Sequence, residues 1–299
     1  SAAEPAARAG SPSDPSGRPP LLVEGQQVSW DQLTRVLGEA AGRAAIEEVT
    51  LHTMLQQEMR RNGLALPAQA TRDEEDLFLV SIRGGADRAS PGRVLSEVRQ
   101  ARGLGPTRYA LLLERNAMLR ALVQPDVRIN DGDLRTAFEV RHGPRRTVRL
   151  IVLPSQREAS QLRADLRRTA DLRQAFIAAA RERSTDATAS RGGLTEPISA
   201  ADPAYALSIR RVVASLAPNQ IGPVVATDGG FALLLLEDDI PADGKSFDAV
   251  ADELAGLLRQ RQERLLMDRL ARQLLTGASI TIFDESLEWA WRQRPSAEN

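Results

Sequence analysis

The chain has 299 residues, with 39 basic residues, 40 acidic residues and no cysteine. That length allows one large or two modest domains with a buried core. The near-balance of charge gives no net field that would favour nucleic acid or an anionic membrane, and the lack of cysteine excludes disulfides and thiolate chemistry. No apolar run is long enough to span a bilayer, so we expect the chain as given to be soluble and trimmed.

The first segment, residues 1–20, is rich in Ala, Pro, Ser and Gly and shows no periodicity, which predicts a disordered leader. Leaders of this kind often separate an export signal or a lipid anchor from the first folded element. An ordinary disordered terminus explains the composition equally well.

Residues 21–145 are expected to form a mainly helical domain. Leu21 to Val28 reads as a short extended piece with a turn, and Ser29 with Gln32 forms a capping box for the helix that follows. We expect this helix to break near two glycines, and we expect the His142-Gly143-Pro144 turn to be a surface loop. The predicted elements are a helix up to Gly38 and Gly42, helices over 43–61, 73–82 and 94–101, a helix from 107 to Pro125, and a helix capped by Asn130.

The central segment, residues 146–240, changes from helical to mixed patterning. A β-branched run predicts a strand that ends at Pro154, and a polar loop precedes a pair of glycines. The turn Asp228-Gly229-Gly230 between two aliphatic runs predicts a hairpin. The predicted elements are a strand over 147–153, helices over 157–168 and after 171, a loop over 184–193, a helical run containing Tyr205, Ile209, Val212 and Val213, and strands over 223–227 and 231–236.

Residues 241–299 begin with a linker and contain the longest predicted helix, from Ser246 to Gly277. This helix is too long for a ninety-residue module, so we expect it to pack back on the N-terminal helical domain. A short strand is predicted over 279–283, followed by an amphipathic end that carries Leu287, Trp289 and Trp291.

Three motifs of the central segment stand in one order over residues 146–240. They are Ser184-x-Asp186 with Gly192-Gly193, Leu216-x-Pro218-x-Gln220-Ile221-Gly222-Pro223-Val224, and Thr227-x-x-Gly230-Phe231. In this order they resemble a parvulin-type (PpiC-like) peptidyl-prolyl isomerase domain. That family usually carries one histidine in its first strand and one in its last strand. Here those positions hold Leu150 and Ala232.

The whole layout resembles the SurA and PrsA type of extracytoplasmic foldase. The cues are Gly25-x-x-Val28-Ser29-x-x-Gln32-Leu33, Gly63-Leu64, Gly103-Leu104 and Val127-x-Ile129-Asn130-Asp131. The resemblance implies an α+β fold. A helical chaperone domain, made of the N-terminal helices and the long C-terminal helix, would carry an inserted parvulin-like β-α-β module with a small antiparallel sheet.

Prolyl isomerisation has no covalent intermediate, so an isomerase needs an apolar pocket and polar groups that favour the twisted amide. The resemblance implies that Asp186 is the loop acid and Tyr205 the aromatic of the proline pocket. The alternatives are that Asp186 caps its own turn and that Tyr205 is a half-buried core residue. The pocket implied by the resemblance consists of Leu150, Tyr205, Thr227, Phe231 and Ala232.

The main functional hypothesis is a foldase or chaperone that binds unfolded or proline-containing polypeptides, with weak or no isomerase activity. One alternative is an active isomerase that uses Asp186 and Tyr205; another is a dedicated interaction module in export or envelope assembly. We expect no cofactor and no nucleic-acid partner, and the two histidines, His52 and His142, are too far apart in sequence to indicate a metal site. The expected location is outside the cytoplasm of a bacterium, with an anchor upstream as an open alternative.

Overall fold

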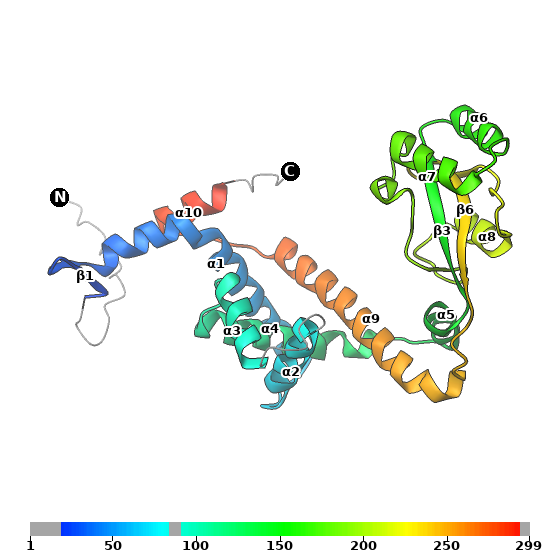
Figure 1. Ribbon diagram of the computed structural model, residues 1–299. Coiled ribbons are helices and arrows are strands. Elements are labelled where there is room, and N and C mark those ends of the chain that lie inside the picture. The colour runs from blue at the N-terminus through cyan, green and yellow to red at the C-terminus, as the bar shows by residue number, and fades with distance from the viewer. Residues whose placement is uncertain (1–18, 84–90, 294–299) are drawn as a thin grey trace, which may run out of the picture. The chain divides into compact units, whose positions relative to one another are not determined.

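The computed structural model describes residues 19–83 and 91–293, so the predicted leader lies almost entirely outside the described residues. The chain divides into two compact units (Figure 1). The helical unit contains residues up to Asp126 and from Glu263 onward, and the module contains Val127–Gln262. These limits lie outside the expected module boundaries of 146 and 240. The α+β fold class predicted from the sequence is confirmed.

The helical unit opens with a β-hairpin made of β1 (Leu21–Val23) and β2 (Gln26–Val28), which pair antiparallel. Its turn residues Glu24 and Gly25 both have positive φ, at 50° and 81°. The predicted capping box then starts α1 (Trp30–Arg61), because the Ser29 side chain accepts from the Gln32 backbone and the Gln32 side chain accepts from the Ser29 backbone.

Helix α1 runs without interruption, so the predicted break at Gly38 and Gly42 is wrong. Both glycines are buried under α10 (Glu285–Arg292), which lies along the first half of α1 (Figure 1). A Cβ at Gly38 would lie 2.3 Å from the Ser286 Oγ, and one at Gly42 would lie 2.8 Å from the Leu287 Cδ2. The glycines therefore permit close helix packing, which offsets their low helix propensity.

The predicted strand over 279–283 is also wrong. These residues connect α9 (Phe247–Gly277) to α10 without joining a β-ladder, and Phe283 is 93% exposed. An isolated extended segment does not become a strand unless a neighbouring backbone pairs with its N–H and C=O groups. None of the described strands pairs with this connector, which ends at Asp284, whose side chain caps α10.

The remaining helices of this unit are α2 (Ala70–Arg83), α3 (Pro91–Ala101), α4 (Pro106–Val123) and the short η1 (Gln124–Asp126). Arg120 on α4 is ion-paired with two largely buried carboxylates, Glu74 on α2 and Glu263 on α9. The core draws on α1, α4 and the second half of α9. Its buried residues are Leu55, Met59, Met118, Leu119, Val123, Met267 and Leu274.

The module is built on a four-stranded antiparallel sheet with the order β4-β3-β6-β5. The central pair is β3 with β6, which meet along their whole length apart from one irregularity at Thr147 and Val148. The elements in chain order are α5 (Asp131–His142), β3 (Arg145–Leu153), α6 (Gln156–Leu166), α7 (Leu172–Arg183), η2 (Ala189–Arg191), β4 (Ile198–Ser199), α8 (Leu207–Ser215), β5 (Val225–Thr227) and β6 (Gly230–Ile240).

The two faces of this sheet have separate cores, because successive side chains of a strand point to opposite faces. Ile151, Leu153, Leu233 and Leu235 pack against α6 and α7. The intervening residues of β3 and β6 pack against α8 and β4, and they are Val148, Val152, Ala232, Leu234 and Leu236. The sheet is thus covered by helices on both faces.

His142 does not lie in a surface loop, contrary to expectation. It ends α5, is 5% exposed, and places its Nδ1 2.7 Å from the Asp243 Oδ2. The chain returns here after β6, and the Asp243 backbone N–H donates to the His142 carbonyl (3.1 Å). This hydrogen bond from His142 is the main reason that the pKa of Asp243 is lowered. A pairing between residues a hundred positions apart leaves no local signal in the sequence.

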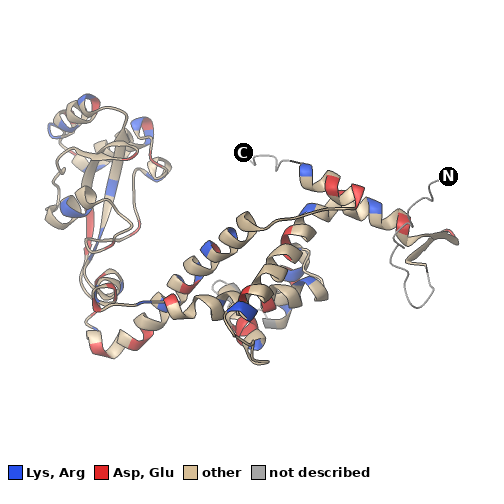
Figure 2. Cartoon of the chain, turned by 180° about the vertical axis from the view of Figure 1, so that it is seen from behind, with Lys and Arg blue, Asp and Glu red and all other residues tan. Residues whose placement is uncertain are grey.

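Charge is distributed evenly over the described helices. Basic and acidic residues alternate along them rather than gathering by sign (Figure 2). None of the described helices is both long and apolar enough to cross a bilayer.

Candidate functional site

A cavity of about 250 Å³ lies on the face of the sheet that α8 covers. Its size is below the range of about 300–1,000 Å³ that is typical of pockets for drug-sized ligands, so it suits a single side chain or ring. Most of its lining is hydrocarbon, with a few hydroxyls and one carboxylate. The lining residues are Val148, Leu150, Val152, Thr185, Asp186, Thr195, Ile198, Tyr205, Ile209, Thr227, Gly229 and Leu234.

The loop over residues 184–193 forms one wall of this cavity and is fastened to β3. The Val152 N–H donates to the Ser184 Oγ (3.1 Å), and the Thr185 N–H donates to the Val152 carbonyl (2.9 Å). Asp186 Oδ1 accepts from both the backbone N–H and the hydroxyl of Thr188, at 2.8 and 2.6 Å. Asp186 therefore caps its own turn while it lines the cavity.

At the C-terminal end of the same loop lie Gly192 and Gly193, and Gly193 lies directly against the backbone of β3. Gly193 has φ +76°, and a Cβ there would lie 2.4 Å from the Leu150 carbonyl oxygen. Its own carbonyl accepts from the Leu150 N–H (2.8 Å). Gly192 has φ +65°, and its carbonyl accepts a hydrogen bond from the Arg149 Nη1 (2.9 Å). Glycine is needed here because the loop approaches the strand backbone more closely than a side chain allows.

Arg149 joins the Gly192 end of the loop to Glu237 on β6. Neither Arg149 nor Glu237 was predicted from the sequence as a site residue. Arg149 is 6% exposed and makes a bidentate pair with Glu237, with Nε–Oε2 at 2.7 Å and Nη2–Oε1 at 3.2 Å. Arg173 on α7 also pairs with Glu237. These two arginines lower the pKa of Glu237, mainly through the hydrogen bond from Arg149. The available signal was an arginine, Arg149, within the aliphatic run Val148–Leu153 of β3.

Tyr205 lies just before α8 and packs half-buried against the core beneath the cavity. Burial raises the pKa of its phenol, and the negative charges of Asp202 and Glu196 raise it further. Its hydroxyl makes no hydrogen bond within the described part of the chain. Tyr205 thus packs against the core and also lines the cavity. The two interpretations drawn from the sequence, a half-buried core residue and a pocket residue, therefore describe the same position.

The five predicted pocket residues divide into two groups. Leu150, Tyr205 and Thr227 line the cavity. Ala232 is fully buried opposite Val152 and does not reach the cavity, because its side chain is a single methyl group. Phe231 packs against the α6 and α7 core, because it is the neighbour of Ala232 in β6 and so points to the opposite face. The structure therefore places Leu150, Tyr205 and Thr227 in the lining of the cavity, and Ala232 and Phe231 outside that lining.

The cavity offers few polar groups to a bound peptide. The Thr195 hydroxyl donates to the Val148 carbonyl (3.1 Å), and the Thr227 hydroxyl donates to the Gly230 carbonyl (3.0 Å). What remains is the Tyr205 hydroxyl and the second carboxylate oxygen of Asp186. No imidazole lines the cavity. Among the described residues, no group of three or more His, Cys, Asp or Glu side chains could hold a metal ion.

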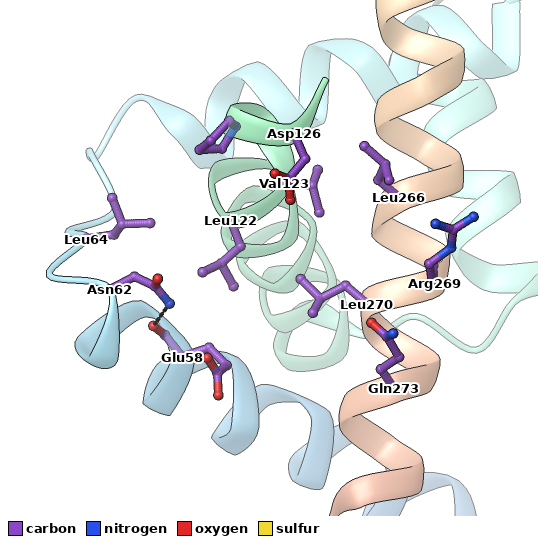
Figure 3. Close-up of a pocket in the computed structure, with 11 residues that line it drawn as sticks. Glu58, Asn62, Leu64, Leu122, Val123, Asp126, Leu266, Arg269, Leu270 and Gln273 are labelled. Carbon is purple, nitrogen blue, oxygen red and sulfur yellow. Dashed lines mark hydrogen bonds between the residues drawn. The ribbon is translucent and has the colours of Figure 1, made fainter. Parts of the chain in front are cut away.

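A second cavity, of about 450 Å³, lies in the helical unit (Figure 3) and was not predicted. Leu122 on α4 and Leu270 on α9 point into it from opposite sides. Polar side chains stand at its margin. On the α1 side the Asn62 Nδ2 donates to the Glu58 carbonyl (2.8 Å), which closes the end of that helix.

The module thus combines a four-stranded antiparallel sheet, helices on both faces, and a small apolar cavity beside a glycine-closed loop. Residues 135–252 match the family model of the PPIC-type PPIASE domain. The match begins within α5 and ends within α9, so it falls inside the module. No curated protein matches the chain.

Several solved structures are similar to the chain as a whole. The peptidylprolyl isomerase PrsA of Bacillus anthracis is 16% identical with a TM-score of 0.46, covering 81% of this chain and 100% of that one. PrsA of Bacillus cereus is 14% identical with a TM-score of 0.41, covering 92% and 97%. A SurA-like chaperone structure from Campylobacter jejuni is 14% identical with a TM-score of 0.33, covering 89% and 100%.

Proposed function

We propose that the protein is a parvulin-like foldase or chaperone that binds unfolded or proline-containing polypeptides with weak or no isomerase activity. The observation that carries this proposal is a cavity of side-chain size in a PPIC-type domain, with leucine and alanine at the two positions where the family usually has histidine. An apolar cavity of this size binds a proline ring by excluding water from it.

Binding and catalysis make different demands on such a cavity. The barrier to prolyl rotation must be lowered by about 1.36 kcal/mol for each tenfold acceleration, and only interactions stronger with the twisted amide contribute. Leu150 presents hydrocarbon, Ala232 is buried, and one oxygen of Asp186 is engaged by Thr188. These features favour retention of a peptide over rotation of its amide.

The proposal includes the partners and the location. The clients are unfolded or extended polypeptides, held without a cofactor. We place the protein in the periplasm or cell envelope of a bacterium, on the basis of its resemblance to extracytoplasmic foldases and its lack of cysteine.

The decisive experiment measures two activities of the full chain side by side. One is the rate of cis-to-trans conversion in a set of X-Pro peptides, and the other is the aggregation of several unrelated unfolded clients. We expect suppressed aggregation without acceleration. Tyr205→Phe removes the free hydroxyl in the cavity, and Tyr109→Phe in the helical unit is the matched control. An acceleration that Tyr205→Phe abolishes and Tyr109→Phe preserves would overturn the proposal.

The second candidate is an active isomerase that uses Asp186 and Tyr205. It is favoured by one observation, the unpaired Tyr205 hydroxyl beside the cavity, because that hydroxyl could donate to a twisted amide. A third candidate is a module dedicated to one partner in export or envelope assembly. Protection of several unrelated clients would count against the third candidate, while acceleration of X-Pro conversion would favour the second.

A further inference from the structure

Carboxylates from several segments belong to the cavity lining of the module or neighbour it in the chain. Asp186 lines it directly, and Asp228 is an exposed residue between the lining residues Thr227 and Gly229. Asp202 shares a tight turn with Tyr205, whose N–H donates to the Asp202 carbonyl (3.2 Å). These acids come from three different loops: Asp186 lines the cavity, while Asp202 and Asp228 neighbour residues that line it.

Their charges are only partly compensated. Glu196, which also acts on Tyr205, pairs with Arg191 at 3.2 Å. Arg210 lies against the same segment and directs its Nε to the Tyr205 carbonyl (3.1 Å). Asp186, Asp202 and Asp228 make no ion pair within the described ranges. Burial is the main reason that the pKa of the Tyr205 phenol is raised, and the negative charges of Asp202 and Glu196 raise it further.

We propose that this cavity selects proline or another small apolar residue that stands next to a lysine or arginine in an extended polypeptide, and that it rejects acidic and phosphorylated segments. The occupant follows from charge complementarity: an apolar side chain fills the cavity while the neighbouring cation faces the three unpaired aspartates. This inference deepens the proposed function and rests on it.

The size of the preference follows from ordinary surface electrostatics. An exposed ion pair changes affinity by about 1.4- to 5-fold, and like charges oppose binding by similar amounts. Moving from an acidic to a basic neighbour exchanges repulsion for attraction, so the combined discrimination is about tenfold at low salt. Screening reduces it at high ionic strength, because the Debye length falls to about 3 Å in 1 M salt. A phosphoserine carries about −2 charge and is rejected most strongly.

The test uses the full chain and short unstructured peptides of the form Ala-Xaa-Pro-Ala, with Xaa as Arg, Lys, Ala, Glu or phosphoserine. Affinity is measured by titration, and methyl NMR shifts of Leu150 and Val152 show that the peptide occupies the cavity. Asp202→Asn keeps the acceptor that caps Ala204 but removes the charge. Asp165→Asn on α6 removes the same charge on the opposite face of the sheet and is the matched control.

We expect the Arg and Lys peptides to bind about tenfold more tightly than the Glu peptide at low salt. Asp202→Asn should reduce that ratio by about two- to fivefold, while Asp165→Asn leaves it unchanged. Occupancy of the cavity with equal affinity for all five peptides would overturn the charge preference and leave the proposed function intact. No occupancy by any peptide would overturn both.

Discussion

Arg149 is the residue on which the structure makes its sharpest stability prediction. It is buried, its guanidinium pairs with Glu237 through two hydrogen bonds, and its third nitrogen holds the Gly192 carbonyl. The substitution Arg149→Met keeps much of the aliphatic stem but removes every one of these contacts. The loop over 184–193, which carries Asp186, loses one attachment at its glycine end and keeps the hydrogen bond from the Leu150 N–H to the Gly193 carbonyl.

The magnitude follows from what the substitution leaves behind. Removing one partner of a buried ion pair costs roughly 3–5 kcal/mol. Glu237 keeps Arg173, whose Nε lies 2.9 Å from its Oε1, and this contact reduces the loss. The orphaned Gly192 carbonyl adds about 1 kcal/mol or more. We expect Arg149→Met to lower the free energy of unfolding of the module by about 2–4 kcal/mol.

The assay can separate the two units. All three tryptophans, Trp30, Trp289 and Trp291, lie outside the module, so their fluorescence reports on the helical unit. Hydrogen exchange of peptides from β3 and from residues 184–193 reports on the module. Arg168→Met, at an exposed arginine of the same module, is the control and should change stability by less than about 0.5 kcal/mol. A loss below about 1 kcal/mol, or unchanged exchange in the loop, would refute the reasoning.

The ion pair between Arg149 and Glu237 predicts that the stability of the module depends on pH. The folded-state pKa of Glu237 is lowered, chiefly by Arg149, below its unfolded value of about 4.3. A carboxyl with a depressed folded pKa stabilises the protein above its unfolded pKa, and this contribution disappears as pH falls through the folded pKa. The stability difference between the wild type and Arg149→Met should therefore be full at neutral pH and shrink below about pH 4. A difference that stays constant into acid would contradict this account.

Three further predictions concern substitutions in the helical unit and at the cavity of the module. Gly42→Val should displace α10 and destabilise the helical unit by about 1–3 kcal/mol, seen as an earlier denaturant midpoint by tryptophan fluorescence. Arg120→Ala should cost about 2–4 kcal/mol by the same readout, because two largely buried glutamates lose their shared cation. Leu150→His should be tolerated at the cavity wall, whereas Ala232→His should destabilise the module by roughly 2–4 kcal/mol, measured by hydrogen exchange.

The elements that sequence reasoning placed well are those with local causes. The capping box at Ser29 and Gln32, the cap at Asn130 and the turn at Gly229 each depend on residues within a few positions. The alternation in β3 and the helical spacing after Asp171 are local too. Such signals also carried the family resemblance, because its motifs are turns and loop closures.

The predictions that failed depend on partners remote in sequence. Gly42 is a helix breaker by propensity, yet α10, some 250 residues later, makes it a packing site. His142 reads as a turn residue until Asp243 returns beside it. Residues 279–283 have a strand's alternation but find no neighbouring strand. In each case the local preference was present and tertiary context decided the outcome.

The two positions where the resemblance implies histidine, Leu150 and Ala232, differ in their access to the cavity. Leu150 still faces the cavity, so an imidazole placed there would meet Asp186, Tyr205 and a bound peptide. Ala232 is sealed beneath the cavity against Val152, where an imidazole would be both oversized and without a partner. A hydrogen-bonded histidine pair would need both Leu150→His and Ala232→His. The second substitution would also require repacking of the core between β3, β6 and α8. The two positions therefore differ in what they could contribute: Leu150 lies at the cavity wall, whereas Ala232 is fully buried in the core beneath it.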